Sequence, residues 1–169
     1  MKRYLRLVMM GLALCAVAAC SSKFKTYEGM EVTGVVVQKE KRVMHLMHHD
    51  KPLKSYRVAL GFTPEGQKTR QGDGRTPEGH YFINRRNPNS QYHLSLGISY
   101  PDASAWRLAR EAGGHPGGDI FIHGEPGDIA KIRRENGRDW TAGCIAVTNA
   151  EIEEIYAMVK NGTLISIYP

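Results

Sequence analysis

The sequence has 169 residues, and its 23 lysines and arginines outnumber the 17 aspartates and glutamates, giving a formal net charge of +6 at pH 7. The basic residues are scattered, and no aromatic residues interleave with a basic stripe, so the composition argues against nucleic-acid binding. The length suits one domain with a hydrophobic core and is too short to favour two.

Residues 1–20 are predicted to be a signal peptide. Three basic residues precede an apolar stretch, 7–19, which is shorter than the roughly twenty residues needed to cross a bilayer and is typical of a secretory signal. The stretch ends in Val17-Ala18-Ala19-Cys20, which resembles the lipobox of bacterial lipoproteins. This resemblance implies cleavage before Cys20 and a lipid on its thiol. An ordinary signal peptide is the alternative.

The predicted processing has consequences for location and charge. Serine rather than aspartate at position 21 implies sorting to the outer membrane, so we expect a lipid-anchored periplasmic protein. Removal of Lys2, Arg3 and Arg6 lowers the formal charge from +6 to +3 (6 − 3). Residues 21–31 are predicted to be a tether with a reach of roughly 30–35 Å. Cys144 would be the one free thiol left, which excludes an intramolecular disulfide.

The remaining chain, 32–169, is predicted to be one mainly β domain, a sandwich or barrel-like fold with a few peripheral helices. Runs rich in β-branched and alternating apolar residues predict strands at 32–37, 43–47, 56–60, 81–83, 119–122 and 163–168. A long loop is expected at 61–79. Helices are expected at 102–112 and after Thr148, with a short helix or a mobile loop at 127–136.

The last helix has the clearest sequence signals. Thr148 and Glu151 have the spacing of a capping box, and Val147 and Ile152 could form a hydrophobic staple around it. Apolar residues then follow at helical spacing, and Gly162 is expected to end the segment.

Cys144 is a candidate nucleophile. A catalytic cysteine needs a base and donors for an oxyanion, and the amides of Gly143 and Cys144 are candidate donors. His123 ends a strand-like run and precedes Gly124, so it is the preferred base. A neighbouring imidazolium would lower the pKa of the thiol and supply a thiolate at neutral pH. The alternative is that Cys144 is a small core residue before a buried strand.

Residue order excludes some cysteine enzymes. Every histidine precedes Cys144, whereas papain-like enzymes place histidine after cysteine. Sortases need an arginine downstream of the cysteine, and none occurs from Ile145 to Pro169.

Three blocks, "GDGRTPEGHYFI", "DIFIHG" and "TAGCIAVTNAEIEEIY…VKNGTLISIY", in this order and at these separations, resemble the L,D-transpeptidase catalytic domain of the YkuD-like family. The likeness covers about Val32 to Tyr168. It implies a mainly β sandwich or barrel-like fold. It further implies Cys144 as the nucleophile, His123 as the general base and acid, a carbonyl on Gly124 that orients the histidine, and site-shaping roles for Thr141 and Gly143. Thr76-Pro77-x-Gly79 matches a structural loop of the family.

The resemblance implies chemistry on peptidoglycan stem peptides without a metal or cofactor. The thiolate would attack the carbonyl at the L-centre of the third-position diamino acid, release D-alanine and form a thioester. A diamino-acid amine, a lysine of an anchored lipoprotein, or water would resolve it. Family members often carry histidine and arginine where this chain has Ala142 and Ala146. Similar substitutions occur in the YafK-like branch, which includes hydrolases and enzymes that cut peptidoglycan–lipoprotein links.

Other hypotheses remain. Arg133, Arg134 and Arg138 could replace the missing substrate-binding arginine, or could form a solvated helix face. A zinc site made of His115, His123 and Cys144 lacks compact ligand spacing. The histidines of "HLMHHD", 45–50, fit a strand that runs into a turn better than a metal site. A non-catalytic wall-binding lipoprotein is the alternative outside the enzymes.

Overall fold

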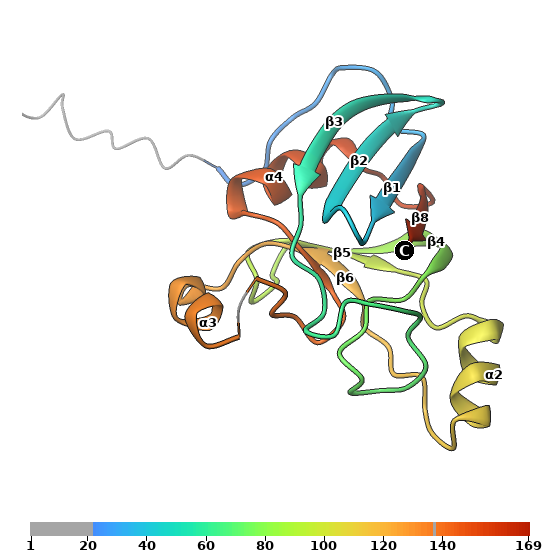
Figure 1. Cartoon of the computed structure of the whole chain (residues 1–169). Helices are drawn as coiled ribbons and strands as arrows, with labels where there is room; N and C mark the ends of the chain where they lie inside the picture. Colours follow the sequence, from blue (N-terminus) through green and yellow to red (C-terminus); the bar gives the residue numbers. More distant parts are fainter. Residues whose placement is uncertain (1–21, 137) are drawn as a thin grey trace, which may run out of the picture.

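The computed structural model describes residues 22–136 and 138–169, so the predicted signal peptide and Cys20 lie outside the described residues. The elements of the described part are β1 (Gly34–Gln38), β2 (Val43–His48), β3 (Lys51–Arg57), β4 (Gly79–Asn87), β5 (Ser95–Ile98), α2 (Ala103–Glu111), β6 (Phe121–His123), α3 (Ile129–Asn136), β7 (Ile145–Ala146), α4 (Asn149–Met158) and β8 (Leu164–Tyr168). Strands outnumber helices, which confirms the predicted mainly β class (Figure 1).

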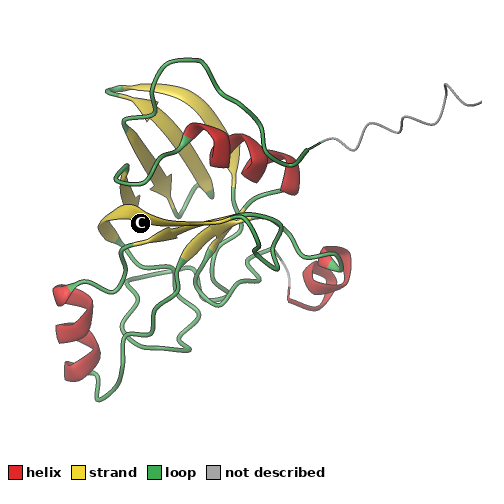
Figure 2. Cartoon of the chain, turned by 180° about the vertical axis from the view of Figure 1, so that it is seen from behind, coloured by secondary structure: helices red, strands yellow, loops and turns green. Residues whose placement is uncertain are grey.

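All eight strands belong to one sheet, in the order β3-β2-β1-β8-β4-β5-β6-β7. The last strand of the chain, β8, lies at its centre, parallel to β1 and antiparallel to β4. The register of β4 against β5 shifts between Ile83 and Arg85, a bulge that bends the strand. The β1–β3 part and the β4–β6 part consequently face in different directions, as the two layers in Figure 2 show.

The core fills the angle between these two parts of the sheet. Val35, Val37, Met44 and Leu46 supply the inward faces of β1 and β2, where buried and less buried residues alternate. Helix α4 covers this core with a face of buried side chains, Ile152, Ile155, Tyr156 and Met158.

The N-terminus of α4 has the predicted capping box. The Thr148 hydroxyl accepts from the Glu151 amide, and the Glu151 carboxylate accepts from the Thr148 amide at 2.9 Å. Such a cap stabilises a helix by about 1 kcal/mol. It also fixes the direction in which the chain leaves β7, because β7 ends only two residues before Thr148.

Several predicted boundaries need correction. Strand β5 lies in a stretch for which no strand was predicted, and β3 covers 51–57 rather than 56–60. The 127–136 segment contains a helix, α3. Residues 22–31, predicted to be a tether, form neither helix nor strand and run past α4 toward the far ends of β1–β3 (Figure 1). Among the described residues, no helix is long and apolar enough to cross a membrane.

Candidate active site

Two short parallel strands bring Cys144 and His123 into the same pocket. His123 ends β6 and lies opposite Ala146 of β7, while Cys144 directly precedes β7. The other edge of β7 is held by Ala59, whose backbone exchanges hydrogen bonds of 2.9 and 2.8 Å with Ala146. Residues far apart in the sequence are thus fixed at one end of the sheet by backbone pairing.

The ring of His123 is buried and has one defined orientation. Its Nδ1 lies 2.7 Å from the carbonyl oxygen of Gly124, as expected from the sequence resemblance. Because a carbonyl oxygen only accepts, Nδ1 carries the proton and Nε2 presents a lone pair. Gly124 has no space for a side chain, since a Cβ there would collide with Asn149 Oδ1 and the Tyr92 carbonyl oxygen.

Two aromatic rings enclose the imidazole. Tyr92 stacks on His123 with ring centroids 4.5 Å apart and an interplanar angle of 30°. Trp140 meets the same ring edge-on at 5.7 Å. The Tyr92 carbonyl also accepts from the Gly124 amide at 3.1 Å, so backbone and ring contacts both hold Tyr92 against the histidine. These contacts restrict the imidazole to one rotamer and keep water from its faces.

The turn before Cys144 is held by Thr141. The Thr141 hydroxyl donates to the Cys144 carbonyl at 2.7 Å and accepts from the Gly143 amide at 3.2 Å. The expectation that the Gly143 amide serves as an oxyanion donor is therefore wrong for this arrangement, because that N–H is already used. The Cys144 amide remains the candidate donor. The Cys144 thiol itself is partly exposed, with Sγ 3.5 Å from the Asp119 carbonyl oxygen.

The loop that contains residues 67–76 packs against the turn that precedes Cys144. Gly143 has φ +131°, and a Cβ there would lie 2.7 Å from the Arg75 carbonyl oxygen, so only glycine fits. Thr76, fully buried, accepts from the Gly61 amide at 3.1 Å. Thr76-Pro77-x-Gly79 thus makes structural contacts and does not line the pocket of Cys144.

A buried ion pair organises the supporting loop. The side chains of Lys68 and Asp73 are 3% and 7% exposed, and Lys68 Nζ lies 2.7 Å from Asp73 Oδ1. The Asp73 carboxylate also accepts from the amides of Thr69, Arg70 and Arg75 at 2.9–3.1 Å. These donors lower the pKa of Asp73 to about 2 despite its burial.

Burial shifts the two central groups toward their neutral forms. It raises the pKa of the Cys144 thiol, and the Asp119 carboxylate adds to the rise, while a hydrogen bond from the Phe121 amide and the charge of Lys68 oppose it. Burial also lowers the pKa of His123, and the hydrogen bond to Gly124 opposes this. Both shifts favour the neutral thiol and the neutral imidazole over the expected thiolate–imidazolium pair, which remains a prediction.

The pocket has a volume of about 480 Å³ and a wall that combines polar groups with apolar and aromatic surface. Cys144, His123 and Phe121 contribute one side of it. A loop between β4 and β5 contributes the other, with amide, hydroxyl and aromatic side chains. The lining residues are Asn87, Asn89, Ser90, Gln91, Tyr92, Ser95, Asp119, Phe121, His123 and Cys144. The wall can donate to and accept from peptide groups of a substrate.

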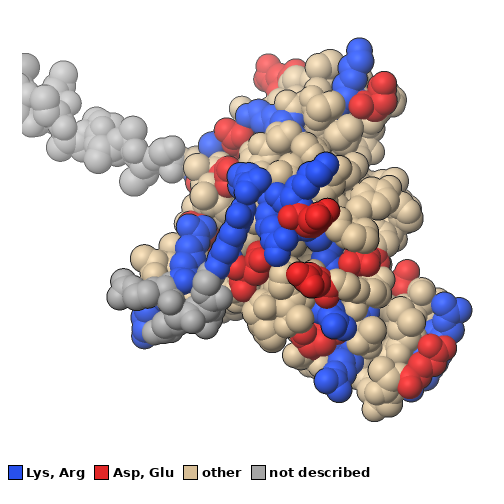
Figure 3. All heavy atoms as spheres, viewed as in Figure 1, with Lys and Arg blue, Asp and Glu red and all other residues tan. Residues whose placement is uncertain are grey.

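The candidate arginines lie elsewhere. Arg133 and Arg138 line a second pocket of about 350 Å³, together with Arg57 and Ala146, and neither lines the pocket of Cys144. Arg133 also forms an ion pair with Glu125. The side chain of Arg134 lies outside the described residues. Figure 3 shows basic side chains gathered on the face beside α3.

The histidine-rich candidates do not form a metal site. Within residues 22–136 and 138–169, no group of three or more His, Cys, Asp or Glu side chains is placed to hold a metal ion. His115 instead accepts from the Gly117 amide at 3.0 Å. His45 lies on β2, as expected, and its Nδ1 is 2.7 Å from Ser55 Oγ.

The structure adds neighbours that the sequence analysis missed. Tyr92 and Trp140 enclose the imidazole, and Asn149 Oδ1 accepts from the Glu125 amide at 2.8 Å beside it. Asp119 meets the thiol through its carbonyl. Of these neighbours, Asn149 belongs to a sequence block that resembles the family, "VTNAEIEEIY", so its position near the site could have been suggested by a motif.

Comparison with known families agrees with this geometry. The profile of the YkuD family, described as the L,D-transpeptidase catalytic domain, matches residues 32–167. The chain belongs to the YkuD family of L,D-transpeptidase catalytic domains. This YkuD domain is similar in sequence to YafK of Escherichia coli K12, with 32% identity over 126 residues that cover 69% of this chain and 44% of YafK. The chain thus spans less than half the length of this curated relative.

Solved structures show the same fold. The helical cell shape determining protein Pgp2 from Campylobacter jejuni superposes with a TM-score of 0.62 and 24% sequence identity. The match covers 83% of this chain and 49% of the Pgp2 chain. Bd1075 from Bdellovibrio bacteriovorus matches 86% of this chain and 50% of its own with a TM-score of 0.57 and 21% identity. An L,D-transpeptidase from Mycobacterium smegmatis has a TM-score of 0.52 and 14% identity over 80% of this chain and 58% of its own. The YkuD domain described here therefore has the fold of solved L,D-transpeptidases.

Proposed function

We propose that this YkuD-family chain is a cysteine-dependent L,D-transpeptidase that acts on peptidoglycan stem peptides through a thioester on Cys144. The observation that carries the proposal is the shared pocket of Cys144 and His123, with the His123 ring oriented by Gly124 so that Nε2 can accept a proton. Substrate, products and partners are part of the proposal. No metal or cofactor takes part in the proposed reaction.

In the first half-reaction, Sγ attacks the carbonyl carbon at the L-centre of the third-position diamino acid while the thiol proton moves to His123 Nε2. The tetrahedral oxyanion is stabilised by the Cys144 amide. The oxyanion collapses, the bond to D-alanine breaks, and the D-alanine amine leaves with the proton from His123. A thioester on Cys144 and a neutral histidine remain.

In the second half-reaction, an amine attacks the thioester carbonyl and gives its proton to His123. Collapse releases the acylated amine, and the proton returns to Sγ. The amine belongs to a second diamino acid, giving a 3-3 crosslink, or to a lysine of an anchored lipoprotein. Thr141 and Gly143 act by holding the Cys144 turn in place during both steps.

A second candidate is a hydrolase of the same fold, an L,D-carboxypeptidase or an enzyme that cuts peptidoglycan–lipoprotein links. The observation that favours it is the pair of alanines flanking the nucleophile, Ala142 and Ala146, where family members often carry histidine and arginine. Loss of those groups alters recognition of the donor and leaves water free to resolve the thioester. A wall-binding lipoprotein without catalysis is the remaining alternative.

The cation missing at position 146 has a candidate replacement. Arg133 and Arg138 line the pocket that Ala146 also lines, so either guanidinium could bind a stem-peptide carboxylate there. Arg134 belongs to the same proposal from sequence alone. We further propose that a lipid on Cys20 anchors the protein in the periplasm, at the outer membrane, as the sequence before and after this cysteine suggests.

The test is incubation of wild type and Cys144→Ala with purified muropeptides, with products identified by mass. Loss of D-alanine with a new crosslink supports the transferase, and loss without one supports the carboxypeptidase. Release of lipoprotein from isolated cell walls supports the link-cutting enzyme. Equal product from the Cys144→Ala variant refutes the proposal, and binding without any product supports the non-catalytic protein.

A further inference from the structure

We propose that Ser22–Lys25, the segment that precedes the YkuD domain, positions the wall of the Cys144 pocket; we call this segment the strap. The family profile begins at residue 32, so the strap lies outside the part of the chain that the family defines. Its role as a positioning element for catalysis rests on the proposed function. Its contacts with the pocket wall do not.

One side chain of the strap ties both ends of the pocket loop. Lys23 Nζ donates to the carbonyl of Pro88 at 2.7 Å and to the carbonyl of His93 at 3.2 Å. The loop between these two carbonyls supplies four residues of the pocket wall, Asn89, Ser90, Gln91 and Tyr92. Charge-assisted hydrogen bonds of this kind are stronger than neutral ones. A single ammonium group therefore bridges the two ends of the loop, just beyond the last pair of the β4–β5 ladder, Asn87 and Ser95.

The loop needs such support because His93 has an unfavourable backbone. Its φ of +72° lies in the left-handed region, which residues with a Cβ rarely adopt without compensating contacts. Lys23 holds its carbonyl, and Glu153 of α4 meets its Nε2 at 2.8 Å. Lys25 of the strap lies 3.3 Å from the other oxygen of Glu153 and donates to the Ala150 carbonyl. The strap and α4 together hold the strained residue.

The strap lies on the surface of the domain, where its aromatic residue, Phe24, remains 53% exposed. Phe24 lies against Tyr156 of α4, with ring centroids 6.3 Å apart, and Lys23 Nζ lies 5.5 Å from the Phe24 ring centre. The strap is therefore bound along α4 at the point where the pocket loop begins and ends.

The link to the chemistry runs through Tyr92. This residue directly precedes His93, stacks on His123 and accepts from the Gly124 amide. When the loop moves, Tyr92 leaves the imidazole and water reaches His123. Because burial is what lowers the pKa of His123, its pKa then returns toward the ordinary value. With the proposed anchor on Cys20, three residues before Lys23, the pocket loop would also be held within roughly 20 Å of the anchor, the sum of three extended residues and the reach of the lysine side chain.

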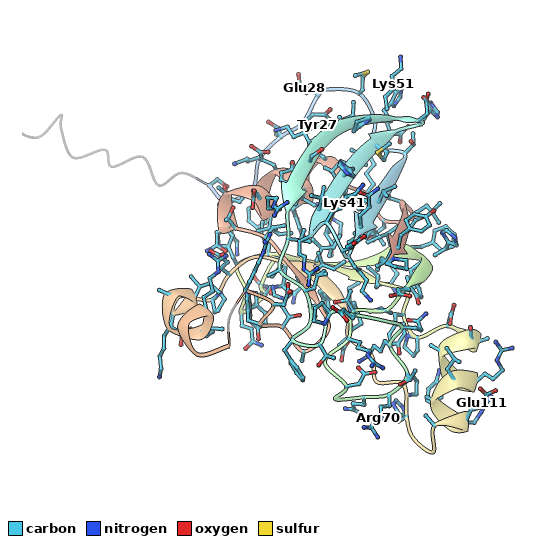
Figure 4. The ribbon with its side chains drawn as sticks, viewed as in Figure 1. Tyr27, Glu28, Lys41, Lys51, Arg70 and Glu111 are labelled. Atoms are coloured by element: carbon cyan, nitrogen blue, oxygen red, sulfur yellow. The ribbon has the colours of Figure 1, made fainter. Side chains whose placement is uncertain are left out.

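The experiment compares Lys23→Met, Lys23→Arg and the control Lys51→Met in the full chain. Lys51 is exposed at the far end of the β2–β3 hairpin (Figure 4), so its loss removes a charge without touching the pocket loop. In Lys23→Met we expect hydrogen exchange of amides 89–94 to be about tenfold faster. We also expect a lower kcat and an acid limb of the pH–rate profile shifted to higher pH. Lys23→Arg should restore both, because its guanidinium can donate to both carbonyls.

Three outcomes separate the strap's contacts from its positioning role and from the proposed function. Exchange of amides 89–94 in Lys23→Met equal to that in Lys51→Met overturns the strap, whatever the turnover. Exchange needs no substrate, so faster exchange in a protein without any turnover on muropeptides supports the strap's contacts while refuting the proposed function. Faster exchange with an unchanged pH–rate profile overturns the positioning role.

Discussion

Replacing Asp73 with asparagine tests how the buried ion pair supports the Cys144 turn. The variant keeps the size of the side chain and one acceptor oxygen, but removes the charge that faces Lys68. The pKa of Asp73 falls from 3.8 to about 2 in the folded protein, a difference of about 1.8 units. At about 1.4 kcal/mol per unit, the charge of this side chain stabilises the fold by about 2.5 kcal/mol at pH 7.

The expected loss is larger than that figure. The variant also leaves the Lys68 ammonium, whose side chain is 3% exposed, without its anion. Removing one partner of a buried pair costs about 3–5 kcal/mol, and the remaining amide oxygen retains some hydrogen bonds, so we expect the free energy of unfolding to fall by about 3 kcal/mol. Because the folded pKa is depressed, the contribution is complete above the unfolded pKa of 3.8 and disappears as the pH falls through about 2.

Urea unfolding of wild type, Asp73→Asn, Lys68→Met and the double variant at pH 7 measures this directly. The double variant has no uncompensated buried charge, so it should lose at least about 1 kcal/mol less than the sum of the two single losses. A loss below about 1 kcal/mol in Asp73→Asn, or additive losses in the double variant, would show that the pair does not stabilise the loop.

Two further predictions concern the nucleophile. Gly143→Ala should lower turnover at least tenfold, because the new Cβ would lie 2.7 Å from the Arg75 carbonyl oxygen. Gly162→Ala also places an alanine at positive φ, +88°, but its Cβ would have no atom within 4 Å, so this variant should lose stability and keep turnover. Equal turnover in both variants would contradict the packing argument. Burial raises the pKa of Cys144 and lowers that of His123, so alkylation of Cys144 by iodoacetamide should rise steadily as the pH exceeds about 8, in wild type and in His123→Ala alike. A rate plateau below pH 7 that the His123→Ala variant loses would instead indicate an ion pair.

Periodic segments of the fold could be predicted from the sequence, whereas segments without a period could not. β1 and β2 alternate apolar and less buried residues, and α4 has a capping box, so local patterns suffice. β5 is short, and all four of its residues are buried, so it has no alternation to detect. β3 starts with polar residues and Pro52, which fits an edge strand but has little strand propensity.

The residues of the candidate site likewise fall into those that the sequence indicated and those that it did not. Sequence blocks suggested Cys144 and His123, and the structure places both in one pocket. Tyr92 gave no signal, because its contact with the imidazole depends on how β5 pairs with β6. The directions in which the two pKa values shift could not be predicted from the sequence, because the degree of burial follows from three-dimensional packing and not from residue spacing.

Formation of a thioester on Cys144 is tested most directly by the intact mass of the protein, measured after brief mixing with a tetrapeptide stem and quenching at low pH. We expect an adduct whose mass equals that of the stem peptide without D-alanine. It should lie on the proteolytic fragment that contains Cys144 and be absent from Cys144→Ser mixed under the same conditions. Release of D-alanine by wild type with no adduct on Cys144 at any mixing time, together with undiminished release by Cys144→Ser, would contradict it.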